Sequence, residues 1–250
     1  MRLLSLAVMS IALLALPSLA SGSKSVTVPD PTAPGLSVNG AIFIREDGGY
    51  GRCSGTSVIA PNRSLVITAG HCVFDDGHWL GRRWVFVPGY RHGERPFGTF
   101  IAHWLGTTPQ WHGAHNDNFD VGAAVVGRNE RGELLAQAAG ADRLVTGRHS
   151  RAFDIYGYPV ARPFNGGTLQ VCQGAARVGH DLEALLMPGP LELGVSCRIS
   201  GGASGGGWFI DGDLLNGVTS SSYTEDPATD YGPYFGDAVG RLARVAGRVR

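Results

Sequence analysis

The chain has 250 residues, of which 43% are hydrophobic and 17% are charged, enough apolar material for a core and too little charge for a disordered chain. Its 21 basic and 21 acidic residues cancel, which argues against a nucleic-acid or anionic-membrane partner. The 38 glycines favour an all-β protein with many turns over a helical bundle, because glycine weakens the interior of a helix.

The first twenty residues have the pattern of an export signal. A positive charge at Arg2 precedes the apolar run Leu3–Leu16, and Ser18 and Ala20 supply small residues for signal peptidase. A membrane anchor is the alternative, but the run is short for a bilayer span and no second one follows. We therefore predict a signal peptide over residues 1–20 and a secreted protein, extracellular or periplasmic, that is free of the membrane after cleavage.

Short apolar runs dominate the rest of the chain. Residues 21–40 are rich in Ser, Pro, Gly and Thr, which predicts a linker or a short pro-segment. The runs that follow are often β-branched or aromatic and are separated by turn residues such as Asp211-Gly212, which is typical of a sandwich or barrel. The expected strands are Ala41–Ile44, Gly55–Ala60, Leu65–Ala69, Trp84–Val87, Phe100–Leu105, Val121–Val126, Phe153–Tyr156, Thr168–Cys172, Leu191–Cys197, Trp208–Ile210 and Leu214–Thr219.

The C-terminal segment has a different period. Apolar residues recur there at steps of three and four, which predicts an amphipathic helix over residues 234–250. Arginines near its end suit the negative end of a helix dipole. The apolar positions are Phe235, Val239, Leu242, Val245 and Val249.

Four cysteines in an exported chain are most simply two disulfides, for which three connectivities are possible. The economical one joins Cys53 to Cys72 and Cys172 to Cys197, each closing a local loop. The chain has no CxxC pair, which argues against a zinc site. The spacing His112-x-x-His115 suggests a metal pair, but it has no helical context or third ligand, so we expect no metal.

Three local motifs carry chemistry, and the first presents a histidine. The apolar run Leu65–Ala69 leads into Gly70-His71-Cys72, so a small-residue turn would hold one imidazole beside a cysteine. A histidine with a pKa near neutrality accepts a proton from a hydroxyl and later donates it to a leaving amine. A histidine held beside a disulfide for packing is the alternative.

The second motif is a serine among glycines, Gly-Gly-Ala-Ser-Gly-Gly-Gly over residues 201–207. Glycines on both sides of Ser204 let the backbone bend sharply and approach a substrate closely. Ser204 would then be a nucleophile, with the amides of Gly202 and Ser204 directed at the oxyanion of a tetrahedral intermediate. Taken alone, the pattern also fits a flexible glycine loop.

The third motif supplies a carboxylate. Asp120 immediately precedes the apolar run Val121–Val126, so its side chain would be drawn into the interior. A buried aspartate needs a partner, and an imidazole N–H is a suitable one. Asp117 competes for the role, but it lies in a polar Asn-Asp-Asn turn that favours solvation. We therefore predict that Asp120 orients His71.

The order His71, Asp120, Ser204 and the sequences around them resemble the trypsin/chymotrypsin superfamily of serine peptidases. The details are similar to bacterial secreted trypsin-like peptidases, including the glutamyl-endopeptidase-like branch. The resemblance covers residues 41–240. Further similar stretches are Gly157-Tyr158-Pro159, Val171-Cys172-Gln173-Gly174, Cys197–Trp208 and Tyr231-Gly232-Pro233-Tyr234-Phe235.

This resemblance implies a fold and an activity. The fold would be all-β, with two six-stranded antiparallel β-barrels over residues 41–130 and 131–233, a cleft between them and a C-terminal helix over 234–250. The activity would be that of a secreted serine endopeptidase with His71 as general base, and with protein or peptide substrates. The family uses no cofactor in this chemistry, and we expect a monomer.

The resemblance also assigns the bridges. In the family a disulfide matching Cys53–Cys72 holds the histidine loop. Cys172–Cys197 would tie together two segments of the second barrel that approach the nucleophile.

Ala203 departs from the family pattern. In trypsin-like enzymes the residue before the nucleophile is an aspartate that pairs with a newly released N-terminus on activation. Alanine cannot form that ion pair. We therefore predict that activation of this chain does not depend on a buried N-terminal ammonium.

Specificity is harder to infer. Arg198 lies six residues before Ser204, a position that in the family commonly forms the base of the specificity pocket. Pointing inward it would favour Glu or Asp before the scissile bond, and a surface arginine is the alternative. Glutamyl endopeptidases place a histidine where this chain has Thr219, so that signature is absent. Thr219 and Ser220 are expected near the pocket, with Ser220 and Ser221 on the edge that pairs with the substrate backbone.

Two other functions remain open. One is a non-catalytic binding protein on the same fold, and the other is an esterase or processing enzyme of narrow specificity. Decayed relatives usually lose one member of the triad, whereas this chain carries all three. That favours catalysis.

Overall fold

The computed structural model describes residues 24–46, 49–80, 83–147, 152–178, 186–199, 201–223 and 226–250. The expected signal peptide, residues 1–20, lies outside the described residues. Most of the regular structure is antiparallel β, and helices are few and short.

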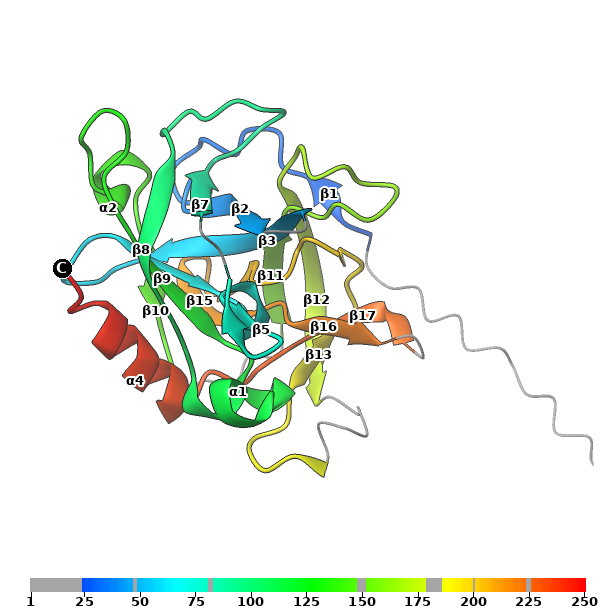
Figure 1. The fold of residues 1–250 in the computed structure, drawn as a ribbon. Helices are drawn as coiled ribbons and strands as arrows, with labels where there is room; N and C mark the ends of the chain where they lie inside the picture. The colour runs from blue at the N-terminus through cyan, green and yellow to red at the C-terminus, as the bar shows by residue number, and fades with distance from the viewer. Residues whose placement is uncertain are drawn as a thin grey trace, which may run out of the picture.

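Six strands of the first half close into an antiparallel barrel in the order β2-β3-β4-β9-β8-β7 (Figure 1). Every residue of β4 and β9 is buried, and Trp84, Phe86 and Phe100 are among the large side chains that fill the interior. The first predicted barrel is therefore confirmed. Its strands are β2 (Asn39–Glu46), β3 (Gly49–Val58), β4 (Leu65–Thr68), β7 (Arg83–Pro88), β8 (Phe100–Thr107) and β9 (Gly122–Val126).

The second half forms a nine-stranded sheet in the order β10-β15-β14-β11-β12-β13-β17-β16, with β1 pairing on β12. Among the described residues this pairing forms a continuous path without ring closure, whereas the strands of the first half close into a six-stranded barrel. The strands are β1 (Val26–Thr27), β10 (Arg143–Leu144), β11 (Ala152–Gly157), β12 (Gln170–Val178), β13 (Leu193–Val195), β14 (Gly207–Ile210), β15 (Leu214–Val218), β16 (Ser221–Tyr223) and β17 (Asp226–Gly232). A small hairpin, β5 (Phe74–Asp75) and β6 (His78–Trp79), stands apart.

Among the described residues the bounded helices are α1 (Pro109–Ala114), α2 (Leu135–Ala138) and α4 (Asp237–Ala246), with 3₁₀ turns η1 (Gly70–Cys72) and η2 (Asp117–Phe119). The expected C-terminal helix exists but is shorter than 234–250. Val239 and Leu242 are buried as predicted, whereas the expectation for Val245 is wrong because it is 59% exposed. The covered face of α4 runs through Val239, Leu242 and Ala246, and Val245 lies beside that face. In the part of the chain that the structure describes, no helix is long and apolar enough to cross a membrane.

The two halves share a hydrophobic cluster that positions the site. Leu65 and Ile67 from the first barrel contact the same cluster as Phe209 and Leu215 from the second half. The helix α4 covers one side of this cluster and lies against β4, β8 and β9 (Figure 1). Burying large apolar side chains stabilises a fold by roughly 1.5–3 kcal/mol each, so the seam between the halves is held firmly.

The segment before the barrel is also packed. Val26 and Thr27 pair with β12, and Val28 is buried in a cluster with Tyr158 and Leu169. Residues 26–28 of the 21–40 segment therefore lie against the second half of the molecule.

Candidate active site

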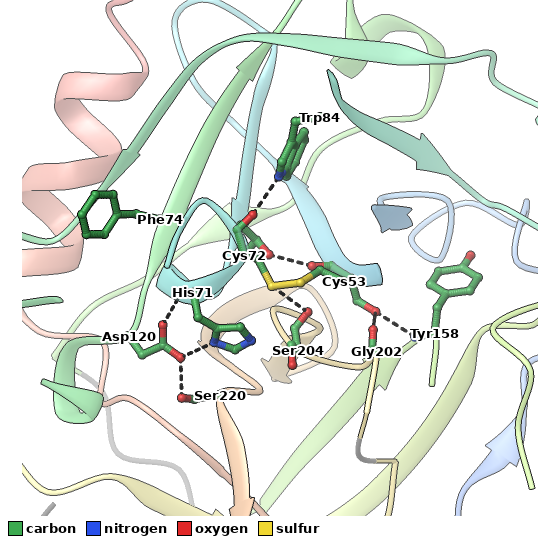
Figure 2. Close-up of a disulfide and its surroundings, with 12 residues drawn as sticks. Cys53, His71, Cys72, Phe74, Trp84, Asp120, Tyr158, Gly202, Ser204 and Ser220 are labelled. Carbon is green, nitrogen blue, oxygen red and sulfur yellow. Dashed lines mark hydrogen bonds and ion pairs between the residues drawn. A yellow bond between two sulfur atoms is a disulfide. The ribbon is translucent and has the colours of Figure 1, made fainter. Parts of the chain in front are cut away.

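His71 lies where the buried strand β4 ends and η1 begins. Only glycine fits at the preceding position 70 without a steric clash, because a Cβ there would lie 2.7 Å from Asp120 Oδ1 and 2.8 Å from the ring of Trp111. The Cys53–Cys72 disulfide ties η1 to β3 on the other side of His71 (Figure 2). The histidine is thus held by a strand end, a close backbone approach and a covalent bridge.

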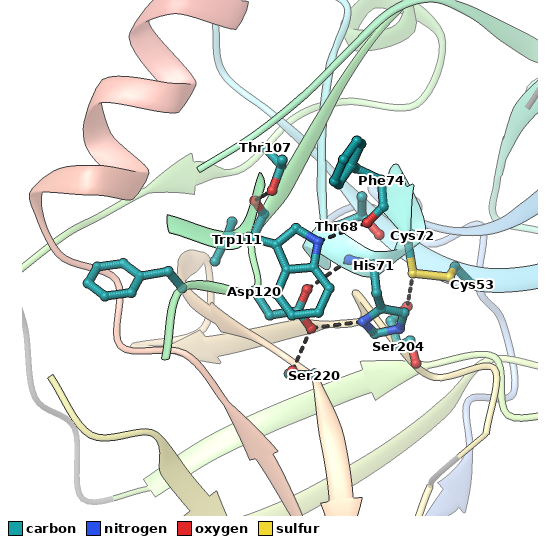
Figure 3. A network of polar contacts seen from close by, with 12 residues as sticks. Cys53, Thr68, His71, Cys72, Phe74, Thr107, Trp111, Asp120, Ser204 and Ser220 are labelled. Carbon is teal, nitrogen blue, oxygen red and sulfur yellow. Dashed lines mark hydrogen bonds and ion pairs between the residues drawn. A yellow bond between two sulfur atoms is a disulfide. The ribbon is translucent and has the colours of Figure 1, made fainter. Parts of the chain in front are cut away.

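Two hydrogen bonds join His71 to Asp120. The His71 backbone N–H donates to Asp120 Oδ1 at 2.8 Å, and His71 Nδ1 lies 2.8 Å from Asp120 Oδ2 (Figure 3). A carboxylate only accepts, so Nδ1 carries the proton and Nε2 keeps its lone pair. The arrangement therefore fixes the tautomer in which Nε2 can act as a base.

Asp120 is fully buried and accepts a further hydrogen bond from Ser220 Oγ at 2.5 Å. Its backbone leaves η2 just before β9, which directs the carboxylate inward as its position before an apolar run predicts. The competitor Asp117 lies in η2, and the carboxylate bonded to His71 is that of Asp120. Burial is compensated by three donors, as a buried carboxylate requires.

Opposing effects set the ionisation of this pair. Burial lowers the pKa of His71, but the charge of Asp120 and its hydrogen bond outweigh burial and raise the pKa above the usual histidine value. Burial likewise raises the pKa of Asp120, and the charge of His71 with the bonds from His71 and Ser220 brings it below the usual range. Asp120 is therefore ionised at neutral pH.

Ser204 lies beside the imidazole, on the edge that faces away from Asp120 (Figures 2 and 3). Its carbonyl oxygen accepts from the Ser54 backbone N–H at 2.8 Å and lies 3.7 Å from the disulfide sulfur of Cys72. No hydrogen bond joins its hydroxyl to His71, both of which are described residues. Catalytic hydrogen bonds are often long in a free enzyme and tighten when substrate binds.

Glycines shape the loop around Ser204. Gly202 has φ +89°, which favours glycine, and a Cβ at Gly205 (φ +77°) would lie 2.0 Å from Thr68 Oγ1. The Gly205 N–H donates to the Thr219 carbonyl at 2.7 Å. Within the described residues, the amides of Gly202 and Ser204 have no hydrogen-bond acceptor. Both N–H groups are therefore available to an incoming oxygen.

Ser54 bridges the loop to its surroundings. Its hydroxyl donates to the Gly202 carbonyl at 2.9 Å and accepts from the Tyr158 N–H at 2.9 Å. Together with its backbone bond to Ser204, Ser54 holds the carbonyls of both residues whose amides are free. The sequence analysis assigned no role to Ser54. The only feature of the sequence that places it near the site is its position directly after Cys53.

The residues expected at the specificity pocket occupy three different settings. Arg198 is exposed. Thr219 is buried and its hydroxyl accepts from Trp208 Nε1 at 2.9 Å. Ser220 is the donor to Asp120.

Both expected disulfides, Cys53–Cys72 and Cys172–Cys197, are formed. Among the described residues, one cluster has metal-ligand spacing, and it consists of His71 with Cys53 and Cys72, whose sulfurs are joined to each other. His112 stacks on Phe74 with ring centroids 4.5 Å apart. Two disulfides suit an extracellular environment.

Several solved structures have a fold similar to this one. The protease Anisep from Arthrobacter nicotinovorans is 32% identical with a TM-score of 0.78, over 85% of this chain and 96% of that one. A thermostable serine protease, AL20, from an extremophilic microorganism is also 32% identical with a TM-score of 0.78, over 87% of this chain and 100% of that one. A Glu endopeptidase at 16% identity and a TM-score of 0.72, over 92% of this chain and 99% of that one, shares the fold.

Sequence comparisons add less. No family model matches the chain. An extracellular metalloprotease of Bacillus subtilis (strain 168) is 32% identical over 74 residues, which span 30% of this chain and 22% of that protein. So short a match does not carry that protein's activity to this chain.

A hydrogen-bonded histidine and buried aspartate, with a serine beside them in a glycine loop, are the groups of a serine hydrolase. With near-complete coverage of relatives at 32% identity, the chain belongs to the trypsin/chymotrypsin-like superfamily of serine proteases. The activity is accordingly that of a serine endopeptidase.

Proposed function

We propose that this protease cleaves peptide bonds through an acyl-enzyme on Ser204, with His71 as general base and Asp120 as the orienting carboxylate. The observation that carries the proposal is the bond between His71 Nδ1 and the buried Asp120 carboxylate, with Ser204 at the opposite edge of the ring. This is the geometry that a hydroxyl nucleophile needs for activation by an adjacent base.

The proposed reaction follows from the protonation states. Neutral His71 takes the Ser204 proton through Nε2 as Ser204 Oγ attacks the substrate carbonyl carbon. The imidazolium then forms next to the Asp120 carboxylate, which stabilises the new charge at 2.8 Å. His71 then gives the proton to the leaving amine, which departs and leaves the acyl group on Ser204 Oγ. In the second half of the reaction a water molecule gives a proton to His71 and attacks the acyl carbon. His71 returns that proton to Ser204 Oγ as the acid product leaves.

The oxygen of the tetrahedral intermediate needs donors. The amides of Gly202 and Ser204 have no acceptor in the described protein, and the loop that carries them is fixed from behind by Ser54. We assign these two amides as the oxyanion hole. Losing one such donor typically costs about 10²–10³-fold in kcat.

Export, architecture and assembly complete the proposal. The apolar N-terminus would direct secretion and be removed after Ala20. The second half would be the partner barrel of the family, with domains over 41–130, 131–233 and 234–250, and the protein would act as a monomer on protein or peptide substrates without a cofactor.

A fluorophosphonate probe tests the mechanism directly. We expect stoichiometric labelling of Ser204 in the folded wild-type protein, and loss of labelling in Ser204→Ala and His71→Ala. Ser222→Ala, an exposed serine nearby, is the matched control and should label normally. A folded wild-type protein that stays unlabelled would contradict the catalytic assignment.

A non-catalytic function deserves the same test, because the fold also occurs in an inactivated protease paralogue from the scabies mite, a structure that shares 15% identity. An esterase of narrow specificity would label with the probe but would leave a peptide library uncut. Hydrolysis of both esters and peptides supports the endopeptidase.

A further inference from the structure

A cavity of about 590 Å³ lies between β8, α1 and α4, and none of His71, Asp120 and Ser204 lines it (Figure 1). Protein pockets that hold small organic ligands typically enclose about 300–1,000 Å³ and are mostly apolar. The cavity therefore has the size and the character of a ligand site. Its main walls are Trp79 of β6, Trp104 of β8, Pro109 of α1, and Arg241, Leu242 and Val245 of α4.

One aromatic wall is built by Trp104. The pairing of β8 with β9 shifts register between Ala102 and Trp104, and such a bulge redirects the side chains next to it. The Trp104 indole lies so close over Gly106 of the same strand that a Cβ at Gly106 would be 2.2 Å from the ring. A bulge and a glycine together therefore allow the indole to lie where it lines the cavity.

A second aromatic wall is Trp79, which is 47% exposed. Its ring is held by Phe74 and His112, whose ring centroids lie 5.0 Å and 5.7 Å from that of Trp79. The exposed Val245 lines the same cavity, so two exposed apolar side chains gather at one place. Gathered apolar exposure, unlike single exposed residues, marks a binding site.

The apolar space continues along β8. A second cavity, of about 330 Å³, shares Trp79, Trp104 and Leu105 with the first and extends to Trp84 and Ala102. The two cavities therefore adjoin and form a long apolar space. A linear alkyl chain is the kind of occupant that fills a long apolar space.

One permanently charged side chain borders this space. Arg241 lines the first cavity, and within the described residues it forms no ion pair. No Asp or Glu is among the described residues that line either cavity. A guanidinium binds a carboxylate through two parallel hydrogen bonds, so a negative charge at the Arg241 end would complement the site.

We propose that this cavity binds a linear aliphatic carboxylate, with the carboxylate on Arg241 and the alkyl chain between Trp79 and Trp104. Burial of the methylene groups supplies most of the affinity. Arg241 supplies the preference for an anion over a neutral or cationic amphiphile. This site goes beyond peptide cleavage and does not depend on Ser204 as the nucleophile.

Titration calorimetry of the full protein with decanoate, octanoate, decan-1-ol and decyltrimethylammonium tests the proposal. We expect one site for decanoate, with a Kd about 5-fold or more below that of decan-1-ol and with the cation binding most weakly. Octanoate is shorter by two methylene groups, so its Kd should be about 10-fold higher than that of decanoate. Equal Kd values for decanoate and decan-1-ol would overturn the proposal.

Variants of the lining separate the charge from the apolar wall. Arg241→Gln should remove the preference for decanoate while the Kd of decan-1-ol stays within about 2-fold of wild type. Arg244→Gln is the matched control, because Arg244 lies on the same helix, approaches Gly240 and does not line the cavity, so it should keep the preference. Trp79→Ser should weaken decanoate and decan-1-ol alike, by about 10-fold or more. Unchanged binding in Trp79→Ser contradicts the placement of the alkyl chain, provided that thermal unfolding shows a folded variant.

Two further measurements locate the ligand. Decanoate should bind with the same Kd after Ser204 has been blocked by the fluorophosphonate, and loss of binding would place the ligand in the catalytic site and overturn the proposal. Sedimentation velocity combined with acrylamide quenching tests for a second copy of the chain over the cavity. A dimer that shields Trp79 and binds no decanoate would also overturn it. The titrations can equally be made on Ser204→Ala, so failure of the proposed function would leave the result for the cavity unaffected.

Discussion

The two halves of the molecule hold their parts of the active site by different means. His71 and Asp120 come from a closed barrel with buried strands, and side-chain hydrogen bonds fix both groups. Ser204 stands on a loop with positive φ at Gly201, Gly202 and Gly205, in a half whose described strands pair along an open path. His71 and Asp120 are therefore held by a closed barrel and by bonds to their own side chains. The loop that carries Ser204 is held instead by hydrogen bonds to its backbone carbonyls and amides from neighbouring segments.

Two of the bonds that hold the nucleophile loop cross between the halves, and both come from Ser54. The Ser54 backbone N–H donates to the Ser204 carbonyl and the Ser54 hydroxyl to the Gly202 carbonyl, whereas the bond from Gly205 to Thr219 lies within the second half. The geometry of the oxyanion donors thus depends on the packing of one half against the other. Variants of the His71–Asp120 pair should therefore change the rate and its pH dependence, whereas variants of the bonds that support the nucleophile loop should change both the rate and the stability of the fold.

The largest effect is expected from Asp120→Asn. An amide in place of the carboxylate no longer fixes the proton on His71 Nδ1 and no longer stabilises the imidazolium, so kcat should fall about 10⁴-fold. Peptide hydrolysis under saturating substrate measures this. Asp117→Asn in the adjacent turn is the control and should change kcat by less than about 2-fold. A similar loss in both variants would mean that the turn, and not the Asp120 carboxylate, is what matters.

The same pair sets the pH profile. The base must be neutral, so kcat/KM falls as the pH drops through the pKa of His71, which Asp120 raises above the usual value of about 6.5. In Asp120→Asn the two largest raising effects are lost, and burial, which favours the neutral imidazole, is opposed only by the smaller effects of Asp75 and Asp117, so the residual activity should persist to lower pH. An acid limb that does not move in the variant would contradict this origin of the shift.

Ser54→Ala tests the bond between the halves. Removing the hydroxyl leaves the Gly202 carbonyl and the Tyr158 N–H without partners, which costs about 1–3 kcal/mol of stability. Because the oxyanion donors lose their support, kcat should also fall about 10–10²-fold with little change in KM.

Ser57→Ala is the matched control on the same strand. Its hydroxyl is buried and donates to the Gly140 carbonyl at 2.8 Å, away from the nucleophile loop. Thermal unfolding should show a comparable loss of stability, while kcat stays at the wild-type level. Equal kcat in the two variants would show that Ser54 supports the fold alone.

The parts of the site that the sequence predicted are those carried by local pattern. Strand β4 and the turn at His71 follow from an apolar run that ends in Ala-Gly, and the inward turn of Asp120 follows from the apolar run after it. Most predicted strands overlap observed ones for the same reason. The Asp211-Gly212 turn likewise appears between β14 and β15 with φ of +53° and +89°.

What the sequence could not predict depends on contacts between distant segments. Strand β17 was missed because Asp226–Gly232 is polar and lacks alternation, and it forms through pairing with β13 and β16. The bond from Ser220 to Asp120 joins residues 100 positions apart, and that from Ser54 to Gly202 joins residues 148 apart. No local pattern encodes such partners.

The smallest change in kcat/KM is expected from extending the N-terminus. This change tests whether the loop that carries Ser204 is ordered by its bonds to neighbouring segments alone. Ala203 is fully buried, and a Cβ at Gly157 would lie 2.9 Å from its methyl group, so the position before Ser204 is apolar and closely filled. Ala203 itself offers no carboxylate to an N-terminal ammonium. A few residues added before Ser21 should therefore change kcat/KM by less than about 2-fold. Complete loss of activity in the extended protein would instead mean that a free N-terminus orders the loop, and that the bonds from Ser54 are insufficient by themselves.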